Sequence, residues 1–187
     1  MTCIVGVAHG GNVWIGGDSA GVAGYAITLR ADKKVFRNGE FLFGFTSSFR
    51  MGQLLEHSLC PPTRHPDTDV FRYMVTDFAD AVRNCLKAGG CATRVDEEEI
   101  GGTFLVGYEG RLFRVDSDYQ IGESIDNFDA VGCGEEFALG SLFATKKLKP
   151  RDRVKVALEA ACHFSAGVRP PLSILKLDGG PMLRLVA

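Results

Sequence analysis

The sequence has 187 residues, of which 45% are hydrophobic and 24% are charged, with a formal net charge of −2 at pH 7. This charge balance gives no electrostatic reason to expect nucleic acid or an anionic membrane surface as a partner. The longest apolar runs are far shorter than a membrane span, and the residues after Met1 lack the basic start and apolar stretch of a signal peptide. These properties favour one soluble domain over residues 1–187.

The cysteines and histidines give no sign of a metal site. Six cysteines are scattered singly through the chain and form no CxxC pair, which argues against zinc-finger and thioredoxin motifs. Four histidines show no HExxH grouping. We therefore expect reduced thiols in a cytoplasmic protein that needs neither a metal nor another cofactor.

The first quarter of the chain has the pattern of short strands joined by hairpin turns. Glycine-containing turns at residues 10–12 and 38–39 separate β-type runs, as in antiparallel hairpins. Residues 18–24 are small and glycine-rich and are predicted as a loop. The first strand begins almost at Thr2, so the N-terminus is expected to be held in a sheet. Strands are predicted at 3–9, 13–17, 25–29, 34–36 and 41–45.

Two helices are predicted next. Residues 49–56 follow a run of hydroxyl residues typical of a helix N-terminus, and three prolines in the following segment end this helix. Apolar residues recur at helical spacing over residues 70–86, which Asp69 precedes as an N-cap. The acidic segment 91–100 is predicted as a solvated loop.

The remainder of the chain repeats this order, with strands first and two helices after them. A turn at residues 109–110 joins two strands, and Pro150 occupies a first-turn position of the last helix. Because hairpins dominate, the fold class is predicted to be α+β, with mostly antiparallel sheets and helices layered on them. Strands are predicted at 103–108, 111–115, 118–121, 128–131, 172–177 and 182–186, and helices at 135–145 and 154–164.

Three residues near the N-terminus carry the strongest functional pattern. Thr2 follows the initiator, Asp18 ends the run Ile-Gly-Gly-Asp, and Lys34 follows Asp18 at the spacing at which Asp18 follows Thr2. Taken singly, a second-position threonine is common, an aspartate in a turn usually caps or is solvated, and a lysine is usually on the surface. Together they form a combination suited to nucleophilic catalysis.

These motifs resemble the proteasome β-subunit and HslV family of N-terminal nucleophile hydrolases, most of all its betaproteobacterial proteasome homologue branch. The resemblance rests on Thr-x-Ile-Val-x-Val at residues 2–7, Gly-Gly-Asp at 16–18 and Lys-Lys-Val at 33–35, with weaker motifs at 44–48 and 130–134 and in the last helix. It covers nearly the whole chain. It implies a four-layer α-β-β-α sandwich, and two stacked rings of six or seven subunits, with seven favoured, around an inner chamber.

The resemblance gives each member of this group a role that the chemistry supports. Once Met1 is removed, Thr2 becomes the N-terminal residue, and its hydroxyl is the implied nucleophile. A free α-amine has a pKa of about 7.7–8.0, which suits a general base for that hydroxyl, acting through one bridging water. Lys34 would favour negative charge on the threonine oxygen, and Asp18 would hold Lys34 in place.

The remaining implied catalytic positions depart from the family pattern. The backbone N–H of Ser47, where the family usually has glycine, is the implied oxyanion donor, and a helix cap is the alternative for this stretch. Cys133 replaces a serine near the amine and is equally well interpreted as a small buried residue. The aspartate of the family's last helix is missing: Cys162 or His163 falls near its place, followed by Ser165. The alignment stays open by one residue there, and a lone helical histidine is more often structural.

Substrate contacts implied by the resemblance run along Gly21 and Val22 and from Phe45 to Phe49, where an extended peptide would add as a strand. Asp32 and Phe49 are implied to line the pocket for the residue that precedes the cleaved bond. The carboxylate of Asp32 leads us to expect a preference for a basic residue at that position.

The sequence thus predicts a threonine-type endopeptidase that cleaves peptides or unfolded proteins inside a homo-oligomeric double ring. Whether an ATP-dependent unfoldase docks on the rings stays open. The alternative is a proteolytically silent, ring-forming scaffold or binding chamber. A third interpretation, nucleotide binding at the glycine-rich turns, is disfavoured because none of these turns has the GxGxxG or P-loop spacing.

Overall fold

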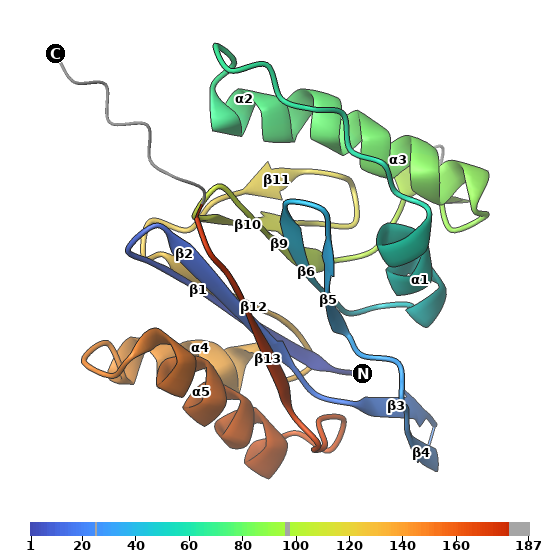
Figure 1. The fold of residues 1–187 in the computed structure, drawn as a ribbon. Helices are drawn as coiled ribbons and strands as arrows, with labels where there is room; N and C mark the ends of the chain where they lie inside the picture. The colour runs from blue at the N-terminus through green and yellow to red at the C-terminus, as the bar shows by residue number, and fades with distance from the viewer. Residues whose placement is uncertain (25, 96–97, 180–187) are drawn as a thin grey trace, which may run out of the picture.

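A computed structural model describes residues 1–24, 26–95 and 98–179 of the chain. Two larger sheets form its centre (Figure 1), and every strand pair within them is antiparallel. The four-stranded sheet has the order β12 (Phe128–Gly132), β1 (Cys3–His9), β2 (Asn12–Gly17), β13 (Ser173–Leu177). The five-stranded sheet has the order β11 (Ile121–Gly122), β10 (Arg111–Val115), β9 (Phe104–Tyr108), β6 (Phe41–Phe45), β5 (Val35–Asn38).

Two hairpins and two groups of helices complete the described fold. The hairpins are β3 (Ala20–Ala23) with β4 (Ala26–Leu29) and β7 (Thr93–Val95) with β8 (Glu98–Ile100). In Figure 1 one helical group lies beyond the five-stranded sheet, comprising α1 (Phe49–His57), α2 (Val70–Tyr73), the π-helical turn η1 (Met74–Phe78) and α3 (Ala79–Ala88). The other group lies beyond the four-stranded sheet and comprises α4 (Glu135–Ala144) and α5 (Pro150–Phe164).

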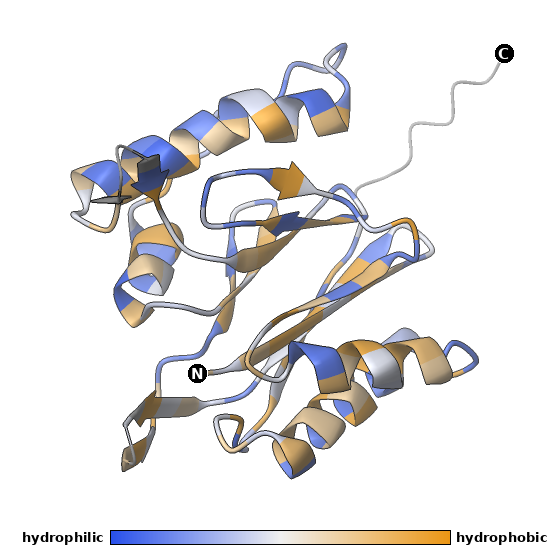
Figure 2. Cartoon of the chain, turned by 180° about the vertical axis from the view of Figure 1, so that it is seen from behind, coloured by the Kyte–Doolittle hydropathy of each residue, from blue (hydrophilic) through white to orange (hydrophobic). Residues whose placement is uncertain are grey.

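Buried apolar side chains form three clusters that follow this arrangement. The first joins helices α1 to α3 to the five-stranded sheet and is rich in aromatic rings, such as Phe41 stacked on Tyr108 with centroids 4.3 Å apart. The second joins α4 and α5 to the four-stranded sheet, and the third lies between the two sheets. Strand β1 contributes to both of the latter, so its apolar run is buried on both faces. Figure 2 shows hydrophobic residues running along the strands, with hydrophobic and hydrophilic residues mixed along the helices.

The predicted fold class is confirmed in its coarse form, as a mixed α/β chain with antiparallel sheets. The prediction of a loop at residues 18–24 is wrong in part, because residues 20–23 form β3. The small residues and glycine of this segment do not give the sequence pattern of a strand, and β3 is stabilised by its pairing with β4. The acidic segment 91–100, predicted as a loop, contains the β7–β8 hairpin. The predicted strand at 182–186 lies outside the described residues.

The helix predicted at residues 70–86 forms, and its middle is the π-helical turn η1. A π-turn inserts one extra residue into the helical repeat, which the apolar spacing does not reveal. No helix within the described residues is long and apolar enough to cross a membrane.

Candidate active site

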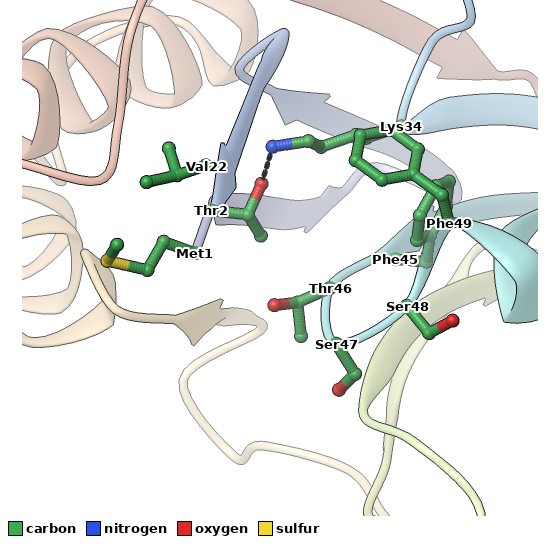
Figure 3. Close-up of a pocket in the computed structure, with 9 residues that line it drawn as sticks. All are labelled: Met1, Thr2, Val22, Lys34, Phe45, Thr46, Ser47, Ser48 and Phe49. Carbon is green, nitrogen blue, oxygen red and sulfur yellow. Dashed lines mark hydrogen bonds between the residues drawn. The ribbon is translucent and has the colours of Figure 1, made fainter. Parts of the chain in front are cut away.

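Thr2, Asp18 and Lys34 meet at the start of β1. The hydroxyl Oγ1 of Thr2 donates a hydrogen bond to Oδ1 of Asp18 at 2.5 Å. The ammonium Nζ of Lys34 donates both to Thr2 Oγ1 (dashed line in Figure 3) and to Asp18 Oδ1, the latter at 3.0 Å. All three residues are buried, with Thr2 only 2% exposed. The structure therefore places a hydroxyl, a cation and a carboxylate in direct mutual contact.

Two different parts of the fold bring these groups together. The β1–β2 hairpin pairs Ile4 with Gly17, so Asp18 comes to lie beside the start of β1. Lys34 belongs to the other sheet, just before β5, and its carbonyl accepts a hydrogen bond from Phe45 N at 3.0 Å. The cation thus reaches Thr2 from the start of β5 in the facing sheet.

The carboxylate of Asp18 is held by backbone donors as well as by side chains. Its Oδ1 accepts from Cys3 N at 3.1 Å, while Oδ2 accepts from Ala20 N at 3.0 Å and from Arg169 N at 3.4 Å. This arrangement leaves Oδ1 facing Lys34 and Thr2. Burial lowers the pKa of Lys34, and the charge of Asp18 opposes that shift. The charge of Asp18 therefore favours the ammonium form of Lys34 beside the threonine oxygen.

Cys133 and Ser165 lie on the carbonyl side of Thr2. The thiol of Cys133 donates to Thr2 O at 3.4 Å and lies 3.5 Å from Ser165 Oγ. His163 does not join this group: it is exposed, and its ring packs edge-on against Phe164. Of the residues near the place of the missing aspartate, Ser165 lies at the site, His163 is exposed on α5, and the half-buried Cys162 packs against the second apolar cluster.

A pocket opens beside the Thr2 hydroxyl (Figure 3). The predicted substrate-contact residues Val22, Phe45 and Phe49 line it, and Gly21 is the neighbour of Val22 on β3. Ser47 also lines the pocket. The full lining consists of Met1, Thr2, Val22, Lys34, Phe45, Thr46, Ser47, Ser48 and Phe49.

In the Thr46–Ser48 stretch, Ser48 caps the following helix and Ser47 lines the pocket. Ser48 is the helix cap, with its Oγ accepting from Arg50 N at 3.2 Å and Met51 N at 3.4 Å. Ser47 has a φ of +66°, and its Oγ accepts from Thr103 N at 3.2 Å. A left-handed conformation is one that glycine adopts freely, so serine here carries local strain. The Thr103 hydrogen bond helps to hold it.

Asp32 is not among the residues that line this pocket, and its preference for a basic residue stays a prediction. Its two carboxylate oxygens accept from Nε and Nη2 of Arg30, both at 2.7 Å. The Arg30 guanidinium in turn lies 4.0 Å above the ring of Phe49. The charge of Asp32 is therefore already paired, and the group that approaches the pocket wall is a cation.

Sequence analysis missed the part played by Arg169 and by the backbone of Gly132. Arg169 precedes two prolines in an irregular stretch, where no pattern marks it. Gly132 has a φ of +104°, and a side chain there would place its Cβ 2.4 Å from Thr2 O. The glycine before Cys133-Gly134 was the one sequence feature that could have indicated this contact, since glycine lets another backbone segment approach closely.

Replacing Gly132 by alanine is expected to lower the free energy of unfolding by about 1–3 kcal/mol, because the backbone is strained for any side chain, and to displace Thr2. Gly140→Ala is the matched control: a Cβ at this position of α4 meets nothing within 4 Å. It should raise stability by about 0.5–1 kcal/mol, since alanine is the better helix former. Urea unfolding of both variants checks this, and equal effects would contradict the assigned role of Gly132.

No family model matches the sequence, and no curated protein matches it. Solved structures do. BPH of Thiobacillus denitrificans is 19% identical, with a TM-score of 0.79 over 96% of this chain and 100% of that one. BPH in complex with epoxomicin gives 0.78 at the same identity and coverage. HslV of Trypanosoma brucei is 16% identical, with a TM-score of 0.67 over 95% of this chain and 99% of that one. The chain therefore shares its fold with BPH and HslV.

Proposed function

We propose that this chain, with its proteasome-like fold, is a threonine-type endopeptidase in which Thr2 attacks peptide bonds once Met1 has been removed. The contact of Thr2 Oγ1 with both Lys34 Nζ and Asp18 Oδ1, at the wall of a pocket, carries the proposal. A hydroxyl becomes a nucleophile only when a base takes its proton and nearby charge stabilises the oxygen.

Each step of the proposed reaction uses a group beside Thr2. The freed α-amine takes the hydroxyl proton, and Oγ1 forms a bond to the peptide carbonyl carbon. Lys34 stabilises negative charge on Oγ1 as that proton leaves, and the backbone N–H of Ser47 donates to the carbonyl oxygen of the tetrahedral intermediate. The carbon–nitrogen bond then breaks, and the protonated amine gives its proton to the leaving nitrogen. Water hydrolyses the remaining ester and restores Thr2.

Removal of Met1 is the condition for this chemistry. While Met1 is present, the Thr2 nitrogen is part of an amide and cannot accept a proton at neutral pH. The Met1 side chain also lines the pocket. We propose that the mature enzyme begins at Thr2 and forms a single domain built as a four-layer α-β-β-α sandwich.

The edge of β3 offers a docking place for an extended substrate. β3 pairs with β4 on one side, and in the described residues no strand pairs with its other edge. Val22 on this strand lines the pocket. A peptide added to β3 by main-chain hydrogen bonds would carry its scissile carbonyl towards Thr2, with a side chain entering the pocket.

We further propose that the enzyme works in the cytoplasm as a homo-oligomer of two stacked rings, with peptides or unfolded proteins as substrates. Several large apolar side chains are exposed on the single chain, among them Leu29 (58%), Phe143 (67%) and Phe164 (66%). Phe164 lies beside the exposed Phe137, with ring centroids 5.5 Å apart, and adjoining exposed apolar side chains of this kind are typical of subunit contacts.

A silent ring-forming scaffold remains the second candidate, and two measurements separate it from the peptidase. Intact mass of the protein purified from its native cells reports whether Met1 is removed. Reaction of the trimmed protein with an epoxyketone such as epoxomicin requires both the Thr2 hydroxyl and a free amine. The peptidase proposal expects loss of Met1 and one covalent adduct per chain, whereas a retained Met1 with no adduct would support the scaffold.

The pH dependence of kcat/KM should be bell-shaped. On the acid side activity rises as the Thr2 amine loses its proton, near a pKa of about 7.7–8.0. On the alkaline side kcat/KM decreases as Lys34 loses its charge. Because burial lowers the pKa of Lys34, this decrease should begin at a pH below the free-lysine pKa of about 10.4. Asp18→Asn removes the charge that raises the Lys34 pKa, so the alkaline limb should move to still lower pH.

Hydrolysis of a fluorogenic peptide between pH 6 and 11 measures these limbs. Lys33→Met is the matched control, because Lys33 is the exposed neighbour of Lys34. It should leave both limbs in place. An alkaline limb that Asp18→Asn does not move would contradict the assignment to Lys34.

A further inference from the structure

Arg169 folds back over the end of α5 and binds three backbone carbonyls with one nitrogen. Its Nη1 donates to Val168 O at 2.9 Å, Ser165 O at 3.1 Å and Cys162 O at 3.3 Å. The last carbonyls of a helix have no partner within the helix, and they form the negative end of its dipole. Cys162 lies in the last turn of α5 and Ser165 is its C-cap, whereas Val168 lies beyond the helix. The guanidinium gives a donor and a positive charge to the helix end and links it to Val168, so it fixes the turn that follows α5.

This turn lies against the groups that surround Thr2. Ser165 Oγ is 3.5 Å from Cys133 Sγ, which donates to Thr2 O. The backbone of Gly167 is so close to Met1 that a side chain on Gly167 would place its Cβ 2.5 Å from Met1 Cβ. When Met1 leaves, the new α-amine of Thr2 is therefore bordered by the turn that Arg169 holds.

The backbone of Arg169 acts on the opposite side of the same site. Its N–H donates to Asp18 Oδ2 at 3.4 Å, and its carbonyl accepts from Ser19 N at 3.3 Å. The Ser19 hydroxyl also donates to Pro171 O at 2.7 Å. The segment that contains Arg169 is thus bonded to the loop that orients the Asp18 carboxylate towards Lys34.

We propose that Arg169 is a positioning residue for the proposed peptidase reaction, a tethered cation that holds the 165–168 turn against the Thr2 amine while its own backbone steadies Asp18. The inference rests on the proposed function. The inference goes beyond the proposed function because it states that Arg169, which contacts neither the Thr2 hydroxyl nor the substrate, positions the general base.

The test uses the full chain with Thr2 verified by mass as its first residue. Arg169→Leu should lower kcat by about 10- to 100-fold, because small misplacements of reacting groups have effects of this size, while KM stays within about twofold. Arg169→Lys should recover part of the rate, since its ammonium can still reach the carbonyls. Added ethylguanidinium at millimolar concentration should accelerate Arg169→Ala and leave the wild type unchanged.

Arg151→Leu is the control, because Arg151 is exposed at the opposite end of α5. It should retain the wild-type kcat. A wild-type kcat in Arg169→Leu overturns the inference. The inference is also overturned if Arg169→Leu and Arg169→Lys lose the same activity, ethylguanidinium rescues none of it, and the melting temperature falls. Those results together would show that Arg169 serves only the stability of the fold. A wild-type enzyme that neither cleaves peptides nor reacts with epoxomicin overturns the proposed function itself, and this inference with it.

Discussion

Replacing Thr2 by alanine is expected to lower kcat/KM for peptide hydrolysis by at least about 10⁴-fold, the scale on which loss of a nucleophile acts in enzymes that form covalent intermediates. The reason is geometric. The Thr2 hydroxyl is the group at the pocket wall that contacts both the Lys34 ammonium and the Asp18 carboxylate. Removing it leaves the amine and the cation in place but takes away the atom that forms the bond to the substrate.

Thr2→Ser is the matched control for this experiment. Serine keeps the hydroxyl, and Met1 is expected to be trimmed from the wild type and both variants because each second residue is small. Thr2→Ser should hydrolyse a fluorogenic peptide and form the epoxomicin adduct, while Thr2→Ala should do neither. Intact mass must first confirm the same N-terminus in all three proteins. Equal activity in Thr2→Ala and the wild type would remove Thr2 from the mechanism.

Replacing Lys34 by methionine is expected to lower the free energy of unfolding by about 3–5 kcal/mol, the usual effect of leaving a buried charge without its partner. The side chains of Lys34 and Asp18 are only 3% and 0% exposed. The same change should abolish peptide hydrolysis, since the cation beside Thr2 Oγ1 is lost. Urea unfolding and fluorogenic peptide assays measure the two effects on one preparation.

A double variant separates stability from catalysis. Lys34→Met combined with Asp18→Leu removes both charges, so the single-variant losses should not add, and the double-mutant cycle should give a coupling of about 0.5–3 kcal/mol. Activity should stay lost, because apolar side chains restore packing and not the charge. Lys33→Met, on the exposed neighbour, should change stability by no more than about 0.5 kcal/mol. Additive losses in the double variant would contradict a direct Lys34–Asp18 interaction.

The hairpins and helices were largely predictable, because the signals that mark them are local. Turn residues, alternating apolar runs and helical spacing report on neighbouring residues along the chain. The predicted strands at 3–9 and 41–45 match β1 and β6. The strand β3 was missed since its stability comes from pairing with β4 and not from its own residues.

The site was predictable in part, and the limits have specific causes. The sequence left Cys162 and His163 as alternatives for the place of the missing aspartate, followed by Ser165, because spacing along the chain does not report which of these side chains faces Thr2. The pairing of Asp32 with Arg30, and the contact of Arg30 with the Phe49 ring, left no pattern in the sequence. Arg169 gave no signal at all, because its partners are backbone carbonyls that carry no sequence information.

The sequence by itself determined the hairpins β1–β2, β5–β6 and β9–β10, the main helices, and the spacing of Thr2, Asp18 and Lys34 that led to the proposed chemistry. Tertiary structure alone decided that Lys34 crosses from the facing sheet to Thr2, that Ser165 reaches the site, and that Arg169 closes the end of α5. The physical reason is that local patterns record turn and burial preferences, whereas contacts between distant side chains depend on how sheets and helix ends pack in space.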